Sequence, residues 1–333
     1  MSMLEGLHRI WRPELYHGRG RRGPFFEGWF YKAVSADGQN IFAVIPAVFI
    51  GERESDSHAL VQVIDGTRRH VFSQRFAINR IRSARREPRL EIGGNLFSLD
   101  AVQLDLDTGQ GRIRADLSLG PAVPWPVKWS SPGAMGWYAF APFMQCYHAV
   151  LSMSHTVNGS LTAGRHAFDL DGGRGYLEKD WGRGFPSAYI WLQCNHFERP
   201  DISVMASVAD IPWLGRSFRG FLFGMRFEGQ WIRLTTYTGA VLSEVEVENE
   251  RVRLTAQDTR FRLELETLRG PGVLLHGPVQ GETRNIYRET LTSTVKLRLS
   301  KRRGLAFEML YQGAGKPAGL DVNGRIGKLL AQA

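Results

Sequence analysis

The sequence predicts an all-β protein made of two antiparallel β-barrels or sandwiches packed side by side, with few short helices. Polar and apolar residues alternate with a period of two over most of the chain, as in strands with one buried face. Short glycine-containing turns interrupt this alternation. A chain of 333 residues is long for one barrel and comfortable for two. We expect one functional unit over residues 1–333, with a first barrel at 20–170 and a second at 171–333.

The first half of the chain carries the strand pattern in several segments. One is an apolar, β-branched run without helical spacing, and the others alternate polar and apolar residues. Asp65-Gly66 and Asn158-Gly159 are hairpin turn signals within this half. The expected strand segments are 38–51, 58–66, 89–120 and 154–175.

The second half repeats the pattern. Glu228-Gly229 and Glu248-Asn249 are the expected turns between pairs of strands. Short strands at this spacing are typical of sandwiches and barrels. The expected strand segments are 218–239, 243–270 and 290–315.

Three segments depart from the strand pattern. Residues 4–13 and 324–333 predict short helices, the first stopped by Pro13. Residues 121–143 contain five prolines and three tryptophans, which predicts a long irregular segment because proline removes ladder donors. Such a segment suits a lid or rim over a pocket, and packing between two barrels explains it equally well.

Composition and charge narrow the class of protein. The formal net charge of +9 attracts nucleic acid or an anionic membrane surface, and a solvated basic surface explains it equally well. The two cysteines, Cys146 and Cys194, make neither a disulfide framework nor a zinc set. Neither a secretory signal nor an apolar run of about 20 residues is present. We expect a cytoplasmic protein with peripheral membrane contact as a further option.

The segment 175–197 holds the first candidate site. In a strand through it, Tyr176, Glu178 and Asp180 share one face, because side chains alternate between faces. Two neighbouring carboxylates repel, so burial favours a protonated acid that can act as a general acid. A pair bridged to neighbouring Lys or Arg side chains is the competing interpretation.

The continuation of this segment predicts a pocket wall. An aromatic and amide face suits a ligand pocket with an apolar body and few directed polar groups. His196 falls on the opposite face, where a structural histidine is the simpler interpretation. The residues expected on the pocket face are Tyr189, Trp191, Gln193, Asn195 and Phe197.

Two further segments place acids and histidines near aromatic rings. Residues 25–32 put Glu27 and Trp29 on one face, as Asp180 precedes Trp181 in the first segment. Aromatic faces stabilise cations, so an acid that protonates an alkene beside such rings suits carbocation chemistry. Residues 142–155 offer Tyr147 and His148 on opposite faces, but no acid at recognisable spacing completes a hydrolase triad.

These segments resemble the tocopherol cyclase family. The matching pieces are WRPELYHG (11–18), FFEGWFYK (25–32), PFMQCYHAVLSM (142–153), GGRGYLEKDWGRGFPSAYIWLQCNHF (172–197) and IPWLGRSFRGF (211–221). The resemblance implies two lipocalin-like (calycin-type) barrels. It also implies cyclisation of a prenylated hydroquinone to a chromanol, with no redox cofactor and no metal. The expected ligand is an apolar prenyl-quinol or polyene.

Local chemistry, set beside the resemblance, gives the candidate site residues. Asp180, Glu178 and Glu27 are the candidate proton donors. Substrate contacts are expected from Trp29, Tyr147, His148, Trp181, Trp191, Gln193, Asn195 and His196. We expect the tryptophans to shape or stabilise the cation, and Gln193, Asn195 and His148 to orient the hydroquinone oxygens.

Four functions remain open at this point. The first is a cofactor-independent cyclase, and the second is a non-catalytic lipid or quinone carrier with the same pocket. The third is a hydratase or isomerase of a polyene. The fourth, a basic nucleic-acid binder, depends on net charge alone, and we expect no specific nucleic-acid partner.

Overall fold

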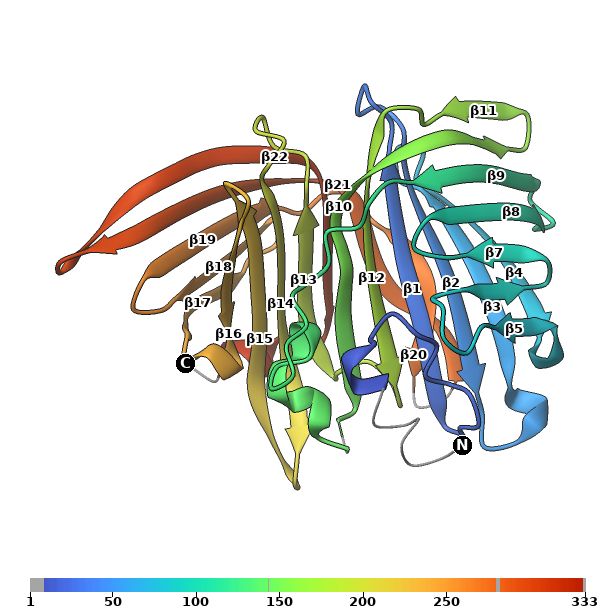
Figure 1. Ribbon diagram of the computed structural model, residues 1–333, viewed down its shortest axis with the longest axis horizontal. Helices are drawn as coiled ribbons and strands as arrows, with labels where there is room; N and C mark the ends of the chain where they lie inside the picture. Colours follow the sequence, from blue (N-terminus) through green and yellow to red (C-terminus); the bar gives the residue numbers. More distant parts are fainter. Residues whose placement is uncertain (1–8, 143, 280–281, 332–333) are drawn as a thin grey trace. The chain divides into compact units, whose positions relative to one another are not determined.

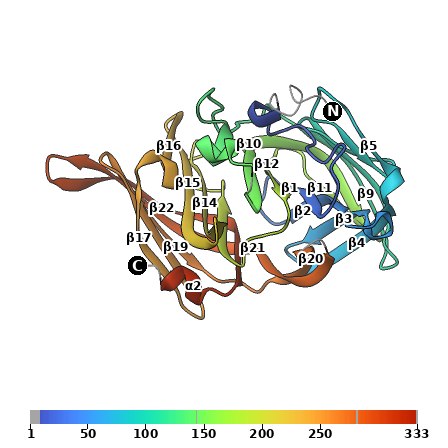
Figure 2. The same ribbon diagram turned by 90° about the horizontal axis from the view of Figure 1, so that it is seen from below.

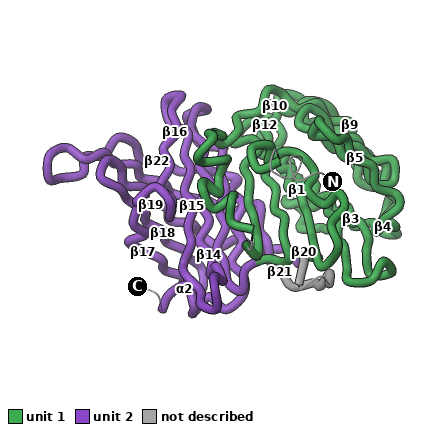
Figure 3. The backbone as a smooth tube through the Cα atoms, turned by 60° about the horizontal axis from the view of Figure 1, so that its bottom comes forward, with its two compact units in different colours: residues 1–185, 275–286 green, residues 186–274, 287–333 purple. Residues whose placement is uncertain are grey.

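The chain folds almost entirely into antiparallel strands, which form two large sheets in the computed structural model (Figure 1). The structure describes residues 9–142, 144–279 and 282–331. The chain divides into two compact units (Figure 3). Unit 1 comprises residues 1–185 and 275–286, and unit 2 comprises residues 186–274 and 287–333. The all-β prediction is confirmed, although the chain divides after Phe185 instead of after residue 170.

Unit 1 is a long curved sheet in the order β4-β3-β2-β1-β12-β10-β9-β8-β7-β6-β5, and β11 pairs with β10. Its strands are β1 (Phe25–Val34), β2 (Ile41–Ile50), β3 (His58–Asp65), β4 (His70–Ala77), β5 (Ile81–Ser83), β6 (Leu90–Ile92), β7 (Asn95–Phe97), β8 (Ala101–Asp107), β9 (Arg112–Leu119), β10 (Cys146–Ala163), β11 (His166–Asp169) and β12 (Gly173–Gly182).

The two arms of the unit 1 sheet approach each other around an apolar core. The backbone N–H of Asp107 in β8 donates to Gln74 Oε1 in β4 at 3.0 Å. One continuous cluster of buried side chains fills the space within, including Val44, Leu104 and Leu177. Burial of this apolar area is the main source of the unit's stability.

Unit 2 has the strand order β16-β15-β14-β13-β22-β21-β19-β18-β17. Ile190, Leu192 and Cys194 point into its buried core. Its strands are β13 (Ala188–Cys194), β14 (Ser203–Trp213), β15 (Arg216–Phe227), β16 (Gln230–Thr235), β17 (Val241–Val247), β18 (Arg251–Gln257), β19 (Phe261–Leu268), β21 (Glu282–Arg303) and β22 (Ala306–Gly324), and β20 (Val273–Val279) pairs with β21.

Both units follow one topology. Each begins with four strands in sequence order, β1 to β4 or β13 to β16. In each, the last strand of the unit, β12 or β22, inserts between the first strand and the preceding long strand, β10 or β21. Each unit therefore has a central strand, β12 or β22, with a neighbour on both sides.

Several local expectations were wrong. Asn158-Gly159 is not a turn, because β10 runs straight through it with Gly159 at φ +116°, and the chain turns at Gly164 instead. Residues 9–13 contain a 3₁₀ turn, η1 (Arg9–Trp11), while residues 4–8 of the expected helix lie outside the described residues. The expected C-terminal helix is confined to α2 (Gly327–Leu330).

Other expectations were confirmed. Glu228 and Gly229, at φ 49° and 71°, form the turn between β15 and β16. Of the expected irregular segment, residues 121–142 are described and are largely irregular, apart from the 3₁₀ segment η4 (Gly133–Phe140). Among the described residues, no helix has the length and apolar character that crossing a bilayer requires.

Candidate functional site

Strand β12 separates two kinds of site in unit 1. Leu177 and Trp181 pack with the apolar core, as expected from strand alternation. Glu178 and Asp180 point to the opposite face. The expected sharing of one face by Tyr176, Glu178 and Asp180 is therefore confirmed.

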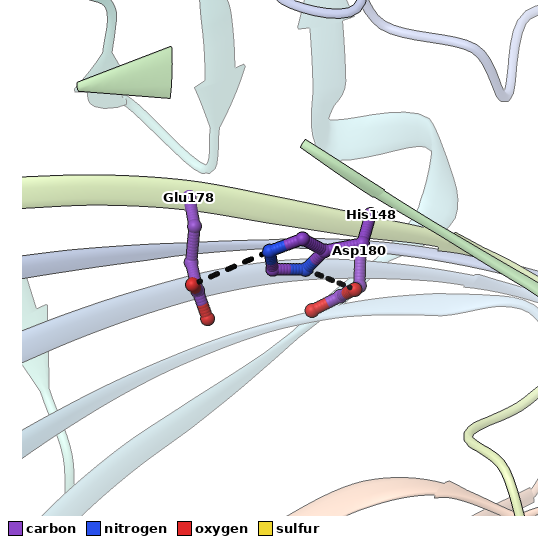
Figure 4. A group of neighbouring side chains, drawn as sticks. All are labelled: His148, Glu178 and Asp180. Atoms are coloured by element: carbon purple, nitrogen blue, oxygen red, sulfur yellow. Dashed lines mark hydrogen bonds and ion pairs between the residues drawn. The ribbon is translucent and has the colours of Figure 1, made fainter. Parts of the chain in front are cut away.

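The acid cluster consists of Tyr176, Glu178, Asp180 and His148, and Figure 4 shows the last three. His148 in β10 lies directly opposite Asp180, and its Nδ1 is 3.0 Å from Asp180 Oδ1. Its Nε2 is 3.7 Å from Glu178 Oε2. The Tyr176 hydroxyl donates to the same Glu178 oxygen at 2.5 Å. The imidazole thus bridges two carboxylates, and one of them is fixed by a phenol.

Electrostatics favour a proton within this cluster. Burial alone would lower the pKa of the His148 imidazole, but the charges of Asp180 and Glu178 raise it to about 9. Burial and the neighbouring Glu178 also raise the pKa of the Tyr176 phenol. His148 is therefore an imidazolium at neutral pH, while Tyr176 keeps its proton.

The same groups could hold a metal ion. His148, Glu178 and Asp180 each offer one ligand atom, and these atoms lie within 4.8 Å of one another. One imidazole and two carboxylates are a donor set that divalent transition metals accept. Among the described residues, no other group of three such side chains brings its ligand atoms this close together. The expectation of no metal stays a prediction.

Phenylalanine rings share the face of the acid cluster. In β1, Phe26, Gly28 and Phe30 lie opposite Gly182, Asp180 and Glu178. Phe26 packs with Phe49 of β2 and with Phe185, while Gly28 presents no side chain beside Asp180. Asp180 keeps 23% of its side chain exposed, against 7% for Glu178. Asp180 is thus the more accessible acid.

The opposite face of β12 carries a buried anchor cluster of Lys179, Glu27 and His17. Lys179 Nζ is 2.6 Å from Glu27 Oε1, and both side chains are fully buried. The same ammonium donates to Leu15 O at 2.5 Å and to His17 Nδ1 at 3.0 Å. The backbone N–H of His17 donates to both Glu27 oxygens, at 3.0 and 2.8 Å. These contacts fasten the N-terminal segment to β1 and β12.

The charges of the anchor cluster compensate one another. Burial alone would raise the pKa of the Glu27 carboxyl, but Lys179 and His17 hold it below its usual range. Burial and the Lys179 charge lower the pKa of His17, so its imidazole is neutral. Glu27 is therefore an ionised partner of Lys179, an arrangement suited to structure more than to proton donation.

Three of the candidate aromatic residues belong to this anchor face. Lys179 Nζ lies 5.1 Å from the Trp29 ring centre and 4.8 Å from that of Trp181. Tyr147 stacks on Trp181 at 5.5 Å. Trp29 and Trp181 thus already stabilise one cation, the Lys179 ammonium. They lie on the face of the sheet opposite Asp180.

A pocket opens beside the anchor face. Its space is about 290 Å³, part of it open solvent. The part that the centres of water-sized molecules can occupy is only about 10 Å³, roughly what a single water requires, so this pocket is too small for a prenylated quinol. Its lining residues include Tyr16, Trp29, Tyr31 and Phe97.

Unit 2 holds the remaining candidates. Trp191 and Gln193 lie on β13, on the face away from the core. His196 Nδ1 is 2.8 Å from Asn195 Oδ1. Phe197 was expected on the Trp191 face but lies in the core, because β13 ends at Cys194 and the alternation ends with it.

A second polar cluster on this face of unit 2 was missed. The Tyr189 hydroxyl donates to Asp321 Oδ2 at 2.7 Å, and Asn323 Nδ2 donates to the Tyr189 oxygen at 3.4 Å. Asp321 lies opposite Trp191 on one side and Glu289 on the other. Asp321 and Asn323 lie beyond the expected strand segment 290–315, and no sequence signal marks Asp321.

The anchor residues were missed for a similar reason. His17 belongs to the motif WRPELYHG, and Lys179 to EKDWGR, yet their contact joins positions 162 residues apart. Periodicity assigns faces within one strand and says nothing about which segments meet. One sequence signal could have found Lys179. In the EKD run, side chains alternate between the two faces of a strand, so Lys179 must point to the face away from Glu178 and Asp180.

Several solved structures share the fold of this protein and define its structural class. Solved structures with this architecture include CghA with Sch210972, at a TM-score of 0.56 and 10% identity over 90% of this chain and 89% of that one. Kievitone hydratase from Nectria haematococca is similar at a TM-score of 0.50 and 11% identity, over 90% and 89%. At such identities the similarity shows the fold alone.

The chain belongs to the tocopherol cyclase-like family, whose model matches residues 94–324. A curated relative is the chloroplastic tocopherol cyclase of Zea mays, 23% identical over 93% of this chain and 77% of the relative. A probable chloroplastic tocopherol cyclase of Oryza sativa subsp. japonica has the same identity and coverage. The resemblance found in the sequence motifs is confirmed.

Proposed function

We propose that this protein is a cofactor-independent cyclase that closes a prenylated hydroquinone into a chromanol by acid catalysis. The observation that carries the proposal is the acid cluster, in which the His148 imidazole bridges Asp180 and Glu178. Such a cluster stores a proton on a face lined by phenylalanine rings. Membership in the tocopherol cyclase-like family supports the same reaction class.

Asp180 is the proposed proton donor. Both of its contacts within the cluster, with His148 Nδ1 and with the Cys146 thiol, involve Oδ1. The proton stored on His148 Nδ1 passes first to the Asp180 carboxylate, and the carboxylic acid so formed delivers it to the alkene. The phenol proton that ring closure releases then restores the imidazolium through Asp180. Glu178, fixed by Tyr176, favours the imidazolium between turnovers.

The proposed reaction is an isomerisation. A C–H bond forms between the Asp180 proton and the less substituted alkene carbon, which leaves a tertiary cation. A lone pair of the phenol oxygen forms the new C–O bond, and the phenol O–H bond breaks. The released proton returns to the Asp180 carboxylate, so neither an oxidant nor a reductant is consumed.

Phe26 and Phe30 are the proposed aromatic neighbours of the cation. They lie on the Asp180 face of β1, two positions either side of Gly28. Aromatic faces stabilise a desolvated cation by roughly 2 kcal/mol. Trp29 and Trp181 are better suited to holding Lys179. Substrate contact by Trp191, Gln193 and Asn195 stays a prediction from the sequence.

Incubation of the purified protein with a phytyl-benzoquinol in deuterated water tests the proposal. A chromanol isomeric with the substrate, with one carbon-bound deuterium, is the expected product. Unchanged substrate that co-purifies with the protein would instead identify a carrier. Equal turnover with a strong chelator and with added divalent ions would separate proton storage from metal binding by the acid cluster.

Hydration is the second candidate function. A solved structure of the same fold is named a hydratase, and the same protonated alkene would give an alcohol if water replaced the phenol oxygen. Its product would be heavier than the substrate by one water. Oxygen-18 from labelled water would appear in an alcohol and be absent from a chromanol.

A further inference from the structure

The irregular segment 121–142 presents aromatic side chains to solvent. Its first part is fixed to β10, where Trp125 N donates to Val150 O at 3.1 Å and Met153 N donates to Val123 O at 2.8 Å. Lys128 and Ser131 then bond each other through both backbone groups and form a tight loop. Trp129 in this loop is 82% exposed, and Trp137 in η4 is 50% exposed.

The N-terminal segment extends this aromatic surface. Trp11 Nε1 donates to Trp129 O at 2.8 Å, and the Trp11 ring meets that of Phe140 at 5.4 Å. Phe140 is itself 40% exposed. Figure 2 shows η1, in dark blue, next to the green segment that contains η4. Several large aromatic side chains therefore gather at one place in unit 1.

Basic residues surround these rings. Arg12 Nη2 donates to Arg86 O at 3.4 Å, which brings the loop 84–89 beside the N-terminal segment. Burial raises the pKa of the Tyr147 hydroxyl, and the nearby charge of the exposed Arg21 opposes this shift. The same hydroxyl donates to Ala141 O at 2.5 Å. Residues 9–22, 84–89 and 121–142 together hold nine Lys and Arg, of which Arg9 is buried, against two Glu.

We propose that this aromatic–basic face (residues 9–22, 84–89 and 121–142) docks on a lipid bilayer that contains anionic lipid. Exposed tryptophans prefer the headgroup region, where an apolar ring and a polar N–H are both satisfied. Each nearby Lys or Arg adds attraction to anionic headgroups. Stable attachment needs two such signals together, and this face supplies both. The proposal is independent of the reaction at Asp180.

Vesicle binding by the full chain tests the proposal. Vesicles of phosphatidylcholine with about 30% phosphatidylglycerol are compared with pure phosphatidylcholine, since anionic lipid is the source of the electrostatic attraction. The native protein should co-sediment with the anionic vesicles, less so at high salt, with a blue shift of tryptophan fluorescence. Trp129→Ser with Trp137→Ser should weaken partitioning roughly tenfold or more, because two large apolar side chains no longer leave water.

The matched control is Leu214→Ser with Leu305→Ser. These leucines are 83% and 99% exposed at turns of unit 2, outside the aromatic–basic face. They should leave vesicle binding unchanged. Equal melting temperatures of all variants would exclude unfolding as the cause.

Three outcomes would overturn the proposal. One is native-like binding by the tryptophan double variant, and another is equal weakening by both double variants. The third is an absence of vesicle binding together with self-association that depends on Trp129 and Trp137. That result would assign the face to contacts between copies of the chain.

Discussion

Units 1 and 2 share a strand order but use the central strand differently. In both, the outer face of the central strand carries a tyrosine-bound carboxylate, Glu178 in unit 1 and Asp321 in unit 2. Unit 1 adds His148 between two acids, whereas the unit 2 carboxylate meets Asn323. A base among acids stores a proton that can be transferred, and an amide does not. The same topology thus carries the proposed proton-donating cluster in one unit and a carboxylate bound by a tyrosine and an amide in the other.

The largest expected difference in kcat between the two units comes from replacing the carboxylate on the central strand of each. Asp180→Asn should lower kcat for chromanol formation by roughly 10²–10⁴-fold, because general acid catalysis contributes that much. Asp321→Asn at the matching strand of unit 2 should keep kcat within about tenfold of native, as expected for a residue outside proton transfer. Single-turnover kinetics with product analysis measures both, and equal losses would show that both clusters take part in the chemistry.

The buried cation of unit 1 should matter more for stability than the exposed one of unit 2. Lys179→Met leaves the Glu27 charge buried and unpaired, so the free energy of unfolding should fall by about 3–5 kcal/mol. Lys328, 3.0 Å from Asp210 but 43% exposed, is the matched residue. Lys328→Met should cost about 1 kcal/mol or less. Denaturant unfolding checks this pair, and Lys179→Met with Glu27→Leu should recover most of the loss.

The His148 imidazole gives the acid cluster of unit 1 a pH dependence. The pKa of His148 is raised from 6.5 to about 9, so its stabilising charge is complete below pH 6.5 and is lost as the pH rises through 9. Turnover should therefore fall on the alkaline side near pH 9. NMR titration of His148 should report this pKa, and Asp180→Asn should lower it. A pKa near 6.5 would contradict the bridged geometry.

The two tyrosines give the smallest contrast. Tyr176→Phe and Tyr189→Phe each remove a hydrogen bond to a carboxylate, worth roughly 1.5–3 kcal/mol of stability. Tyr176→Phe should also lower kcat severalfold, since Glu178 then loses its fixed position beside His148. Tyr189→Phe should leave kcat unchanged. Thermal unfolding and steady-state kinetics on the two variants separate the effects.

Strand alternation alone predicted much of the site. It placed Tyr176, Glu178 and Asp180 on one face of β12, as observed. It could not predict that β10 would bring His148 opposite Asp180, because register between strands depends on packing across the whole sheet. The same limit hid the contact between Lys179 and His17.

The fold class was equally accessible, and its exceptions have local causes. The turn at Glu228-Gly229 formed where two residues adopt positive φ, whereas Asn158-Gly159 was absorbed into β10. There Gly159 approaches the Asp116 carbonyl so closely that a Cβ would lie 2.0 Å from its oxygen. Glycine in this case permits close approach between strands instead of a reversal of the chain.

Unit 1 is built from two separate parts of the sequence, so the ribosome cannot synthesise it as one continuous segment. Its residues 275–286 are synthesised only after most of unit 2. The Gln62 side chain, which donates to His276 O at 2.9 Å and accepts from His276 N at 3.0 Å, has no partner there until then. Pairings between such distant positions form slowly and leave strand edges open during synthesis. A chain cut after residue 274 should therefore aggregate, and nascent protein should depend on chaperones until its last strands emerge.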